Sequence, residues 1–312
     1  MAASLAGRGR PLSHPNPAVG CVLVRDGRIV GRGWTQKGGR PHAEAMALDQ
    51  AGEQARGAAA YVTLEPCAHA SPRGPCCADL LIRAGIASVI IGVTDPDPRT
   101  SGKSIARLRE AGIDVSVLEC RASRRSLEGY LMRSHSGRPH ITLKLATSMD
   151  GCIAQADGCS QWITGPIARN HCHLRRSQSD AILVGGATWR IDQPKLNVRL
   201  PGIEQRSPQR WVLTSQPVAE GIHTLAKVED VIRMDDIQYL YIEGGAQTAA
   251  SFLAANLVDT IDIYRAPIII GQGIAAIGDI GLASLDEAHG RWRLRDQRPL
   301  GADLYTTYER ID

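Results

Sequence analysis

Three cysteines and a histidine are crowded into the segment EPCAHASPRGPCC, which runs from Glu65 to Cys77. Such a cluster is a disulfide framework, a metal site or an accident of composition. The N-terminal stretch MAASLAGRGRPLSHPNP lacks the sustained apolar core of a signal peptide, so we expect a cytoplasmic protein. In a reducing compartment, cysteines are thiols or metal ligands rather than bridges. The sequence therefore favours a metal loop.

A histidine and a glutamate precede this loop at the start of a predicted helix. His42 and Glu44 follow Gly38-Gly39-Arg40-Pro41, and a predicted strand further on ends at Pro66-Cys67. One imidazole and two thiolates make three tetrahedral zinc ligands and leave a fourth position for water, whose pKa zinc lowers to about 7. A carboxylate two residues past the histidine can pass the water's proton to a leaving amine. The order H-x-E…P-C-x-x-C is the signature of zinc deaminases.

Two adjacent cysteines compete to be the third ligand. We predict Cys76, because it is nearer to the turn and would occupy the helix start, with Cys77 facing the core. A closed structural zinc site is the alternative, and its fourth ligand would be His69, Cys77 or Cys21. Most of the scattered cysteines are expected to be small buried hydrophobes. The scattered cysteines are Cys21, Cys120, Cys152, Cys159 and Cys172.

Composition bounds the classes of protein that fit. The chain has 312 residues, 43% of them hydrophobic and 22% charged, which is ordinary for a globular protein and enough for two domains. Its net charge of +4 is too small and too dispersed to indicate nucleic acid, and suits phosphorylated small molecules. No apolar run approaches the ~18 residues of a membrane span. We expect neither a nucleic-acid nor a membrane partner.

The first half alternates strand and helix signals. A hairpin is predicted over 18–34, where two apolar runs flank Asp26-Gly27. Further strands are predicted at 59–66, 86–96 and 113–118, and helices at 42–55, 76–85 and 104–112. This alternation favours a sheet with helices on both faces.

A basic, polar stretch over 121–140 carries no strand signal and ends near Arg138-Pro139. We place the domain boundary there, with domains over 1–138 and 139–312. A second α/β series follows, with strands predicted within 141–151, 180–190, 210–215, 239–245, 260–271 and 302–311.

The second half has a weaker chemical signal. It holds no G-x-G-x-x-G, and GQGIAAIG fails on spacing, so a Rossmann dinucleotide site is not supported. In EGGAQTAASFL a strand, two glycines and a helix follow one another, and the backbone N–H groups could cradle a pyrophosphate. A plain strand-to-helix turn is the alternative. Trp162 would be a core residue or would pack against a cofactor ring.

These segments together resemble a known family. The long spacing between Cys67 and Cys76, with HPNPAVGCVLV and TLEPCAH before it, is similar to the deaminase half of the bifunctional riboflavin-biosynthesis deaminase/reductase. The segments ITLKLATSMDG, SQWITG, AILVGGATWRIDQPKLNVR and YIEGGAQTAASFL resemble its reductase half. The resemblance implies a two-domain α/β fold. It would comprise an N-terminal cytidine-deaminase-like three-layer α/β/α domain and a C-terminal dihydrofolate-reductase-like α/β domain.

The resemblance also implies the chemistry. The first domain would use zinc to hydrolyse the 2-amino group of 2,5-diamino-6-(5-phosphoribosylamino)pyrimidin-4-one. The second would use NADPH to reduce the ribosyl group to ribityl, and the chain would form a homo-oligomer. One alternative is a zinc deaminase of another aminopyrimidine with an inactive C-terminal domain. Another is a non-catalytic nucleotide-binding protein whose zinc is structural.

By the same resemblance, roles fall on individual residues. The deaminase set is His42, Cys67 and Cys76 as zinc ligands, Glu44 as proton shuttle, and Asn16 and His69 at the substrate. The NADPH set is Ala146, Trp162, Thr188, Asp192, Thr214, Gly245, Ala246, Gln247, Thr248, Ala249, Ala250 and Ser251. The reductase substrate set is Ser160, Arg176, Leu196, Arg199 and Glu243, with the arginines near the phosphate.

The chain departs from the family pattern in three places. The metal loop reads Ser-Pro-Arg-Gly-Pro-Cys instead of Gly-Arg/Lys-Thr-Pro-Pro-Cys, which moves its basic residue to Arg73, and no role is assigned to it. Asp192-Gln193-Pro194 keeps only the first aspartate of Asp-Asp-Pro. The chain is also short between Thr214 and Tyr241. The sequence indicates no proton donor for the reductase.

Overall fold

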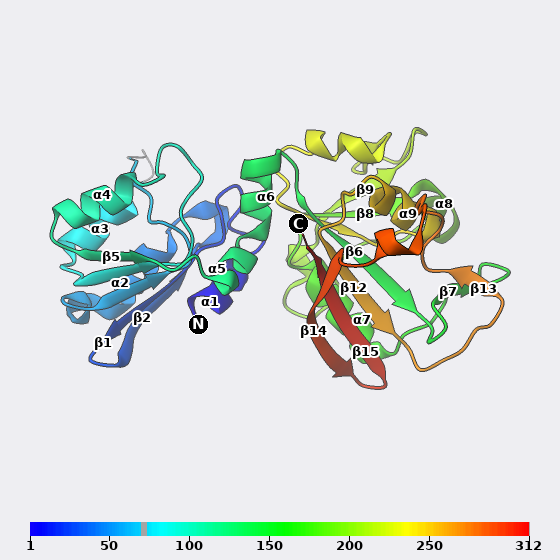
Figure 1. The fold of residues 1–312 in the computed structure, drawn as a ribbon, viewed down its shortest axis with the longest axis horizontal. Coiled ribbons are helices and arrows are strands. Elements are labelled where there is room, and N and C mark those ends of the chain that lie inside the picture. Colours follow the sequence, from blue (N-terminus) through cyan, green and yellow to red (C-terminus); the bar gives the residue numbers. More distant parts are fainter. Residues whose placement is uncertain (70–73, 312) are drawn as a thin grey trace. The chain divides into compact units, whose positions relative to one another are not determined.

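The structure, a computed structural model, describes residues 1–69 and 74–311, which fall into two units, Met1–Gly137 and Arg138–Asp312 (Figure 1). Arg73 lies outside the described residues. Among the helices of the described part, none has the length and apolar character needed to cross a membrane.

The predicted hairpin opens the sheet of the first unit. Strands β1 (Gly20–Arg25) and β2 (Arg28–Trp34) are antiparallel, and Asp26 and Gly27 join them with φ of 50° and 72°. Positive φ at both turn residues matches the right-handed twist of the strands. The sheet continues with β3 (Ala59–Val62), β4 (Ser88–Ile91) and β5 (Asp114–Val117) in the order β2-β1-β3-β4-β5. Strands β3, β4 and β5 are parallel.

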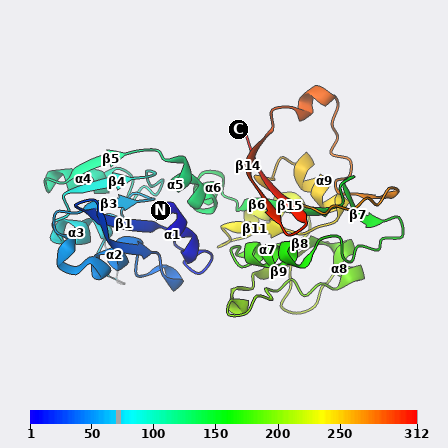
Figure 2. The same cartoon turned by 90° about the horizontal axis from the view of Figure 1, so that it is seen from below.

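Two glycines show that helices cover both faces of this sheet. A Cβ on Gly20 would overlap the carbonyl oxygen of Ala2 in α1 (Ala2–Gly9), and one on Gly33 would overlap that of Ala43 in α2 (Ala43–Ala51). Gly20 pairs with Trp34, the residue after Gly33, so the two glycines point to opposite faces. The predicted three layers are confirmed, and Figure 2 shows them edge-on.

The remaining helices of the first unit complete these layers. On the α2 side, α3 (Cys77–Arg83) contacts both α2 and α4 (Lys103–Glu110). The polar stretch before the boundary forms α5 (Arg121–Ser126) and α6 (Glu128–Ser136), which ends at Gly137 with φ 67°. Short 3₁₀ turns span Lys37–Gly39 and Gly52–Ala55.

The second unit is built on an eight-stranded sheet in the order β10-β9-β8-β11-β6-β12-β15-β14. Its strands are β6 (His140–Thr147), β8 (Ala181–Gly185), β9 (Gln209–Leu213), β10 (His223–Leu225), β11 (Tyr239–Ile242), β12 (Thr260–Arg265), β14 (Trp292–Leu300) and β15 (Asp303–Arg310). The run from β10 to β12 is parallel, whereas β15 is antiparallel to both β12 and β14. Strands β7 (Cys152–Gln155) and β13 (Gly273–Ala275) pair separately. The two-domain α/β class is confirmed.

The helices of this unit are α7 (Pro166–Arg176), α8 (Gly186–Asp192) and α9 (Ala246–Ala254), with 3₁₀ turns at Glu204–Arg206, Val228–Arg233 and Leu285–Ala288. The chain enters the unit through a buried ion pair. Arg138 donates to both carboxylate oxygens of Asp259, at 2.7 and 2.8 Å, and Asp259 also accepts from the Ile141 backbone N–H at 2.8 Å. This pair fixes the start of β6 beside the start of β12.

Candidate functional site

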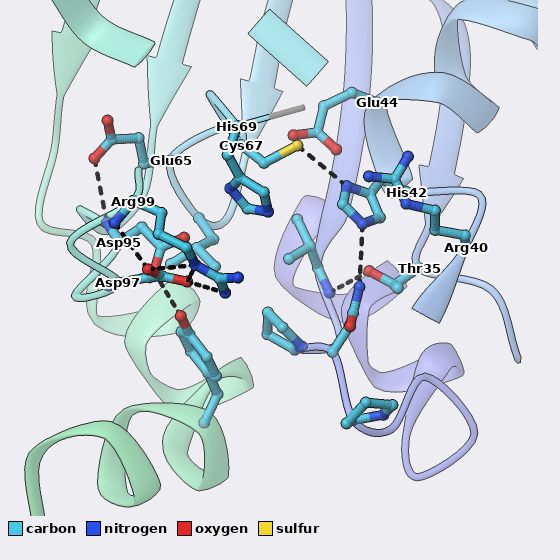
Figure 3. Close-up of a pocket in the computed structure, with 16 residues that line it drawn as sticks. Thr35, Arg40, His42, Glu44, Glu65, Cys67, His69, Asp95, Asp97 and Arg99 are labelled. Atoms are coloured by element: carbon cyan, nitrogen blue, oxygen red, sulfur yellow. Dashed lines mark hydrogen bonds and ion pairs between the residues drawn. The ribbon is translucent and has the colours of Figure 1, made fainter. Parts of the chain in front are cut away.

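The predicted zinc ligands His42 and Cys67 lie beside Cys77, the alternative third ligand, at the edge of the first sheet. His42 is the N-cap of α2, Cys67 follows β3, and Cys77 is the first residue of α3. His42 Nδ1 lies 3.2 Å from Cys77 Sγ and 3.6 Å from Cys67 Sγ, and one donor atom from each residue lies within 4.8 Å of the others. Loop ends and helix starts therefore bring one imidazole and two thiols to one point, and Figure 3 shows His42 and Cys67 of this group.

In the structure Cys77, rather than the predicted ligand Cys76, lies beside His42 and Cys67. Cys76 is the N-cap of α3, and its Sγ accepts from Arg107 Nη1 at 3.6 Å, while Arg107 Nη2 lies 2.5 Å from Asp79 Oδ1. Cys77, which we predicted to face the core, turns toward His42. Successive helical residues are rotated by about 100°, so only one of two adjacent cysteines can face the loop.

The donor set fits zinc. With zinc–sulfur bonds of ~2.3 Å and zinc–nitrogen bonds of ~2.0 Å, neighbouring donors in a tetrahedral site lie roughly 3.5 Å apart. The two nitrogen–sulfur distances, 3.2 and 3.6 Å, lie on either side of that value. Within the described residues this cluster has three donors, and a zinc site with three protein ligands keeps a fourth position for water, as catalytic sites do.

Hydrogen bonds and burial shift the pKa values of the side chains in and around this cluster. The side-chain hydrogen bond from Cys77 lowers the pKa of the Cys67 thiol to about 4, and the Cys77 backbone N–H donates to Cys67 Sγ at 3.2 Å. Glu44, in the first turn of α2, is only 3% exposed, and burial raises its pKa. A buried carboxyl with a raised pKa is suited to receiving and returning a proton.

A cavity of about 380 Å³ opens onto this cluster. The predicted substrate residues Asn16 and His69 both line it. Asn16 Nδ2 lies 3.2 Å from His42 Nε2 and donates to the Gly39 carbonyl at 3.1 Å, while His69 Nδ1 lies 3.4 Å from Thr100 Oγ1. Both residues predicted to contact the substrate therefore line the same cavity.

The opposite wall was missed from the sequence. It carries Glu65, Asp95, Asp97, Arg99 and Tyr130. Tyr130 donates to Asp95 at 2.6 Å, and Glu65 accepts from Ser104 Oγ at 2.8 Å. The run TDPDPR, which overlaps the end of the predicted strand at 86–96, was the available signal, because polar residues at the carboxyl end of a parallel strand face ligand clefts.

In the second unit, the predicted NADPH residues follow the carboxyl ends of neighbouring parallel strands. Ala146 lies near the end of β6, Thr188 in α8 after β8, Thr214 just after β9, and Gly245 after β11. In open α/β sheets this edge is where ligands bind. The topology thus brings to one edge residues that are far apart in sequence.

Two Gly-Gly turns close around a threonine at this edge. A Cβ on Gly185 or on Gly244 would collide with the side chain of Thr248, in the first turn of α9. A Cβ on Gly245, the N-cap of α9, would lie 3.6 Å from Thr188 Oγ1. The later part of the predicted segment differs, since the Ala249 side chain is fully buried in the core.

The predicted substrate residues Arg176 and Glu243 form a buried ion pair. Arg176 donates from Nε and Nη2 to Glu243 at 2.5 and 2.8 Å and from Nη1 to the Asn197 carbonyl at 3.0 Å. Lys144 Nζ lies 3.7 Å from Glu243. Burial alone would raise the pKa of Glu243, but the charges of Arg176 and Lys144 outweigh it and lower the pKa to about 2. Lys144 was missed, although a lysine inside the buried run ITLKLAT was a signal for it.

The other predicted residues of this unit lie in different environments. Leu196 is 3% exposed and packs with Ile182, Val184 and Val212, so its side chain belongs to the core. Ser160, Asp192 and Arg199 are exposed. Trp162 is 65% exposed, with the Arg169 guanidinium 4.8 Å from its ring centre, so it is not a core residue.

Comparison with known proteins covers both units. The family described as "Cytidine and deoxycytidylate deaminase zinc-binding region" matches residues 1–93, and "RibD C-terminal domain" matches residues 139–306. The riboflavin biosynthesis protein RibD of Escherichia coli K12 is 39% identical, over 97% of this chain and 96% of its own length.

Two solved structures share the whole fold. Acinetobacter baumannii RibD superposes with a TM-score of 0.84 at 34% identity, covering 100% of this chain and 97% of its own. A Thermotoga maritima protein described as a diaminohydroxyphosphoribosylaminopyrimidine deaminase/5-amino-6-(5-phosphoribosylamino)uracil reductase superposes with a TM-score of 0.88 at 29% identity. It covers 99% of this chain and 97% of its own.

Proposed function

We propose a role for each residue cluster from one premise: this chain belongs to the RibD family of riboflavin biosynthesis proteins. It is a bifunctional enzyme of the riboflavin pathway, with a zinc-dependent deaminase domain and an NADPH-dependent reductase domain. The deaminase residues are those of 1–138 and the reductase residues those of 139–312. The protein acts in the cytoplasm as a homo-oligomer.

The deaminase substrate is 2,5-diamino-6-(5-phosphoribosylamino)pyrimidin-4-one, and the amine lost is the one at position 2. The observation that carries this proposal is the cluster of His42, Cys67 and Cys77 at a cavity that also holds Glu44. These three residues would hold zinc, which would act as a Lewis acid and lower the pKa of the attacking water. Glu44 takes the proton of the attacking water and hands it to the leaving amine.

Other cavity residues orient the pyrimidine. Asn16 beside His42 and His69 beside Thr100 both line the cavity, where their polar atoms can hydrogen-bond the ring. Asp95 and Asp97 on the opposite wall accept hydrogen bonds, which suits amino and hydroxyl groups of the ribosylamino portion.

The reductase acts on the deaminated product and reduces its ribosyl group to ribityl. NADPH supplies the hydride, and the open-chain imine form of the sugar offers C1′ as the electrophile. The protein orients the two reactants. The turns at Gly185-Gly186 and Gly244-Gly245, with Thr188 and Thr214, hold the cofactor, and Glu243, Arg176 and Arg199 hold the substrate.

One experiment tests both activities together. Purified zinc-loaded protein is supplied with the diaminopyrimidine substrate and NADPH, and ammonia release and NADPH oxidation are followed in the same cuvette. We expect both signals, with ammonia leading. Ammonia without NADPH oxidation would favour the alternative of a deaminase with an inactive second domain, and the absence of both with zinc bound would contradict the proposed function.

Arg199→Ala is expected to weaken binding of the reductase substrate while leaving NADPH affinity unchanged. Arg199 is an exposed cation near the Arg176–Glu243 pair, whose own charges are already matched. Charge-assisted hydrogen bonds contribute about 1.5–3 kcal/mol, so KM should rise roughly 10- to 150-fold. NADPH affinity is measured by fluorescence titration. Arg210→Ala is the matched control, because Arg210 lies at the amino end of β9, away from the edge that carries the predicted binding residues. An unchanged KM in Arg199→Ala would show that Arg199 is not part of the substrate site.

A further inference from the structure

The charges around the deaminase cavity are unevenly distributed. On the wall away from His42, three carboxylates gather and the one arginine there is already paired. Arg99 donates from Nε and Nη2 to the two carboxylate oxygens of Asp97, at 3.0 and 2.5 Å. Glu65 and Asp95 line the same wall. A phosphate placed there would meet more negative than positive charge.

Arg40 lines the cavity from the other side and is electrostatically different. It stands two residues before His42, and its Nη1 donates to the Pro75 carbonyl at 3.3 Å. Its Nε is buried and has no hydrogen-bond partner within the described part of the chain. Among residues 1–69 and 74–311, no carboxylate pairs with it. Figure 3 shows Arg40 beside His42, across the cavity from Arg99.

The Arg40 guanidinium also lies against the metal loop. A Cβ on Gly74 would be 3.2 Å from Arg40 Nη1, and Pro75, which accepts its hydrogen bond, directly precedes Cys76. One side of the guanidinium is therefore held by the loop, while the buried Nε has no partner in the part of the chain that the structure describes. A planar cation with donors to spare, fixed at the edge of a cavity, is suited to binding an oxyanion.

We propose that Arg40 binds the 5′-phosphate of the deaminase substrate, a role that rests on the proposed function. Its guanidinium donates to the phosphate oxygens, and the acidic wall opposite excludes the phosphate from the other end of the cavity. The substrate is thereby oriented in one direction. Arg40 gives the deaminase its preference for the phosphorylated over the dephosphorylated compound.

The test compares two substrates in matched variants. The rate of ammonia release, as kcat/KM, is measured for the 5′-phosphorylated substrate and for its dephosphorylated analogue, in wild type, Arg40→Gln, Arg40→Lys and Arg28→Gln. Arg28 is an exposed arginine in the β1–β2 hairpin and controls for loss of one positive charge. We expect Arg40→Gln to lose roughly 10- to 150-fold with the phosphorylated substrate only. Arg40→Lys should recover part of that loss.

Two further measurements separate a binding role from a structural one. Bound zinc should be equal in all variants, and inorganic phosphate should inhibit deamination of the dephosphorylated analogue competitively in wild type but not in Arg40→Gln. An equal loss for both substrates, or loss of zinc, would show that Arg40 supports the metal loop and would overturn the inference. Loss of phosphate preference in Arg99→Gln instead would also overturn it. A wild-type protein that deaminates neither compound would overturn the proposed function itself.

Discussion

Glu44→Gln is expected to slow deamination by about 10²- to 10⁴-fold while zinc stays bound and the reductase stays active. The substitution keeps the size of a buried side chain and removes only its capacity to take and return a proton. General acid–base catalysis contributes roughly 10²- to 10⁴-fold, so ammonia release should fall by about that factor. Glu44 is not one of the three clustered donors, so metal content should stay at the wild-type level.

Three readouts are needed for this variant: ammonia release, bound zinc by elemental analysis, and NADPH oxidation with the deaminated compound as substrate. The last reports on the second unit, which Glu44 does not belong to. Glu53→Gln, in the exposed 3₁₀ turn after α2, is the control for removing a carboxylate from the same region. Deamination near the wild-type rate in Glu44→Gln would contradict the assigned role.

Cys77→Ser loses zinc and deamination, whereas Cys76→Ser keeps both. Cys77 Sγ lies 3.2 Å from His42 Nδ1, while Cys76 Sγ contacts Arg107 instead. Loss of an outer partner of a metal ligand already costs about 10- to 100-fold in metal affinity, and loss of one of three direct donors should cost more. The two serine variants are distinguished by their metal content after gel filtration, and circular dichroism establishes that both are folded. Zinc lost only from Cys76→Ser would restore the assignment made from sequence.

The sequence pattern does not determine which of Cys76 and Cys77 faces His42. The segment PCCADLL indicates a helix and a ligand near its start, but the facing side chain depends on which residue is the N-cap. A shift of one residue turns a side chain by about 100°. Helix boundaries are uncertain by one or two residues in any sequence pattern, which is more than this decision tolerates.

Elements with strong local signals were predicted well. The hairpin at Asp26-Gly27 and the apolar runs of β3, β6 and β11 follow from turn chemistry and burial of both faces of a sheet. Strand β14 was missed, because WRLRDQRPL is largely exposed and has no β-branched residue. It forms by pairing with β15 at the sheet edge, so its conformation comes from a partner rather than from its own composition.

The sequence also did not predict which side chains form ion pairs across the sheet. Arg176 and Glu243 stand 67 positions apart, and only the order of the strands brings α7 over the end of β11. The resemblance to a family assigned both residues to the substrate without indicating that they neutralise each other. Arg40 stands next to the metal motif, but within the described residues only its lack of a carboxylate partner distinguishes it from Arg99, which pairs with Asp97.

Gly33 determines how closely the helix that carries His42 and Glu44 packs on the sheet. The first turn of α2 rests directly on its backbone, and that turn carries both His42 and Glu44. Any side chain at this position would lift the helix from the sheet and move the metal ligand and the proton carrier together, away from Cys67 and Cys77. The geometry of hydrolysis is thus set by a residue that touches neither metal nor substrate, and metal affinity and turnover are bound to vary together at that position.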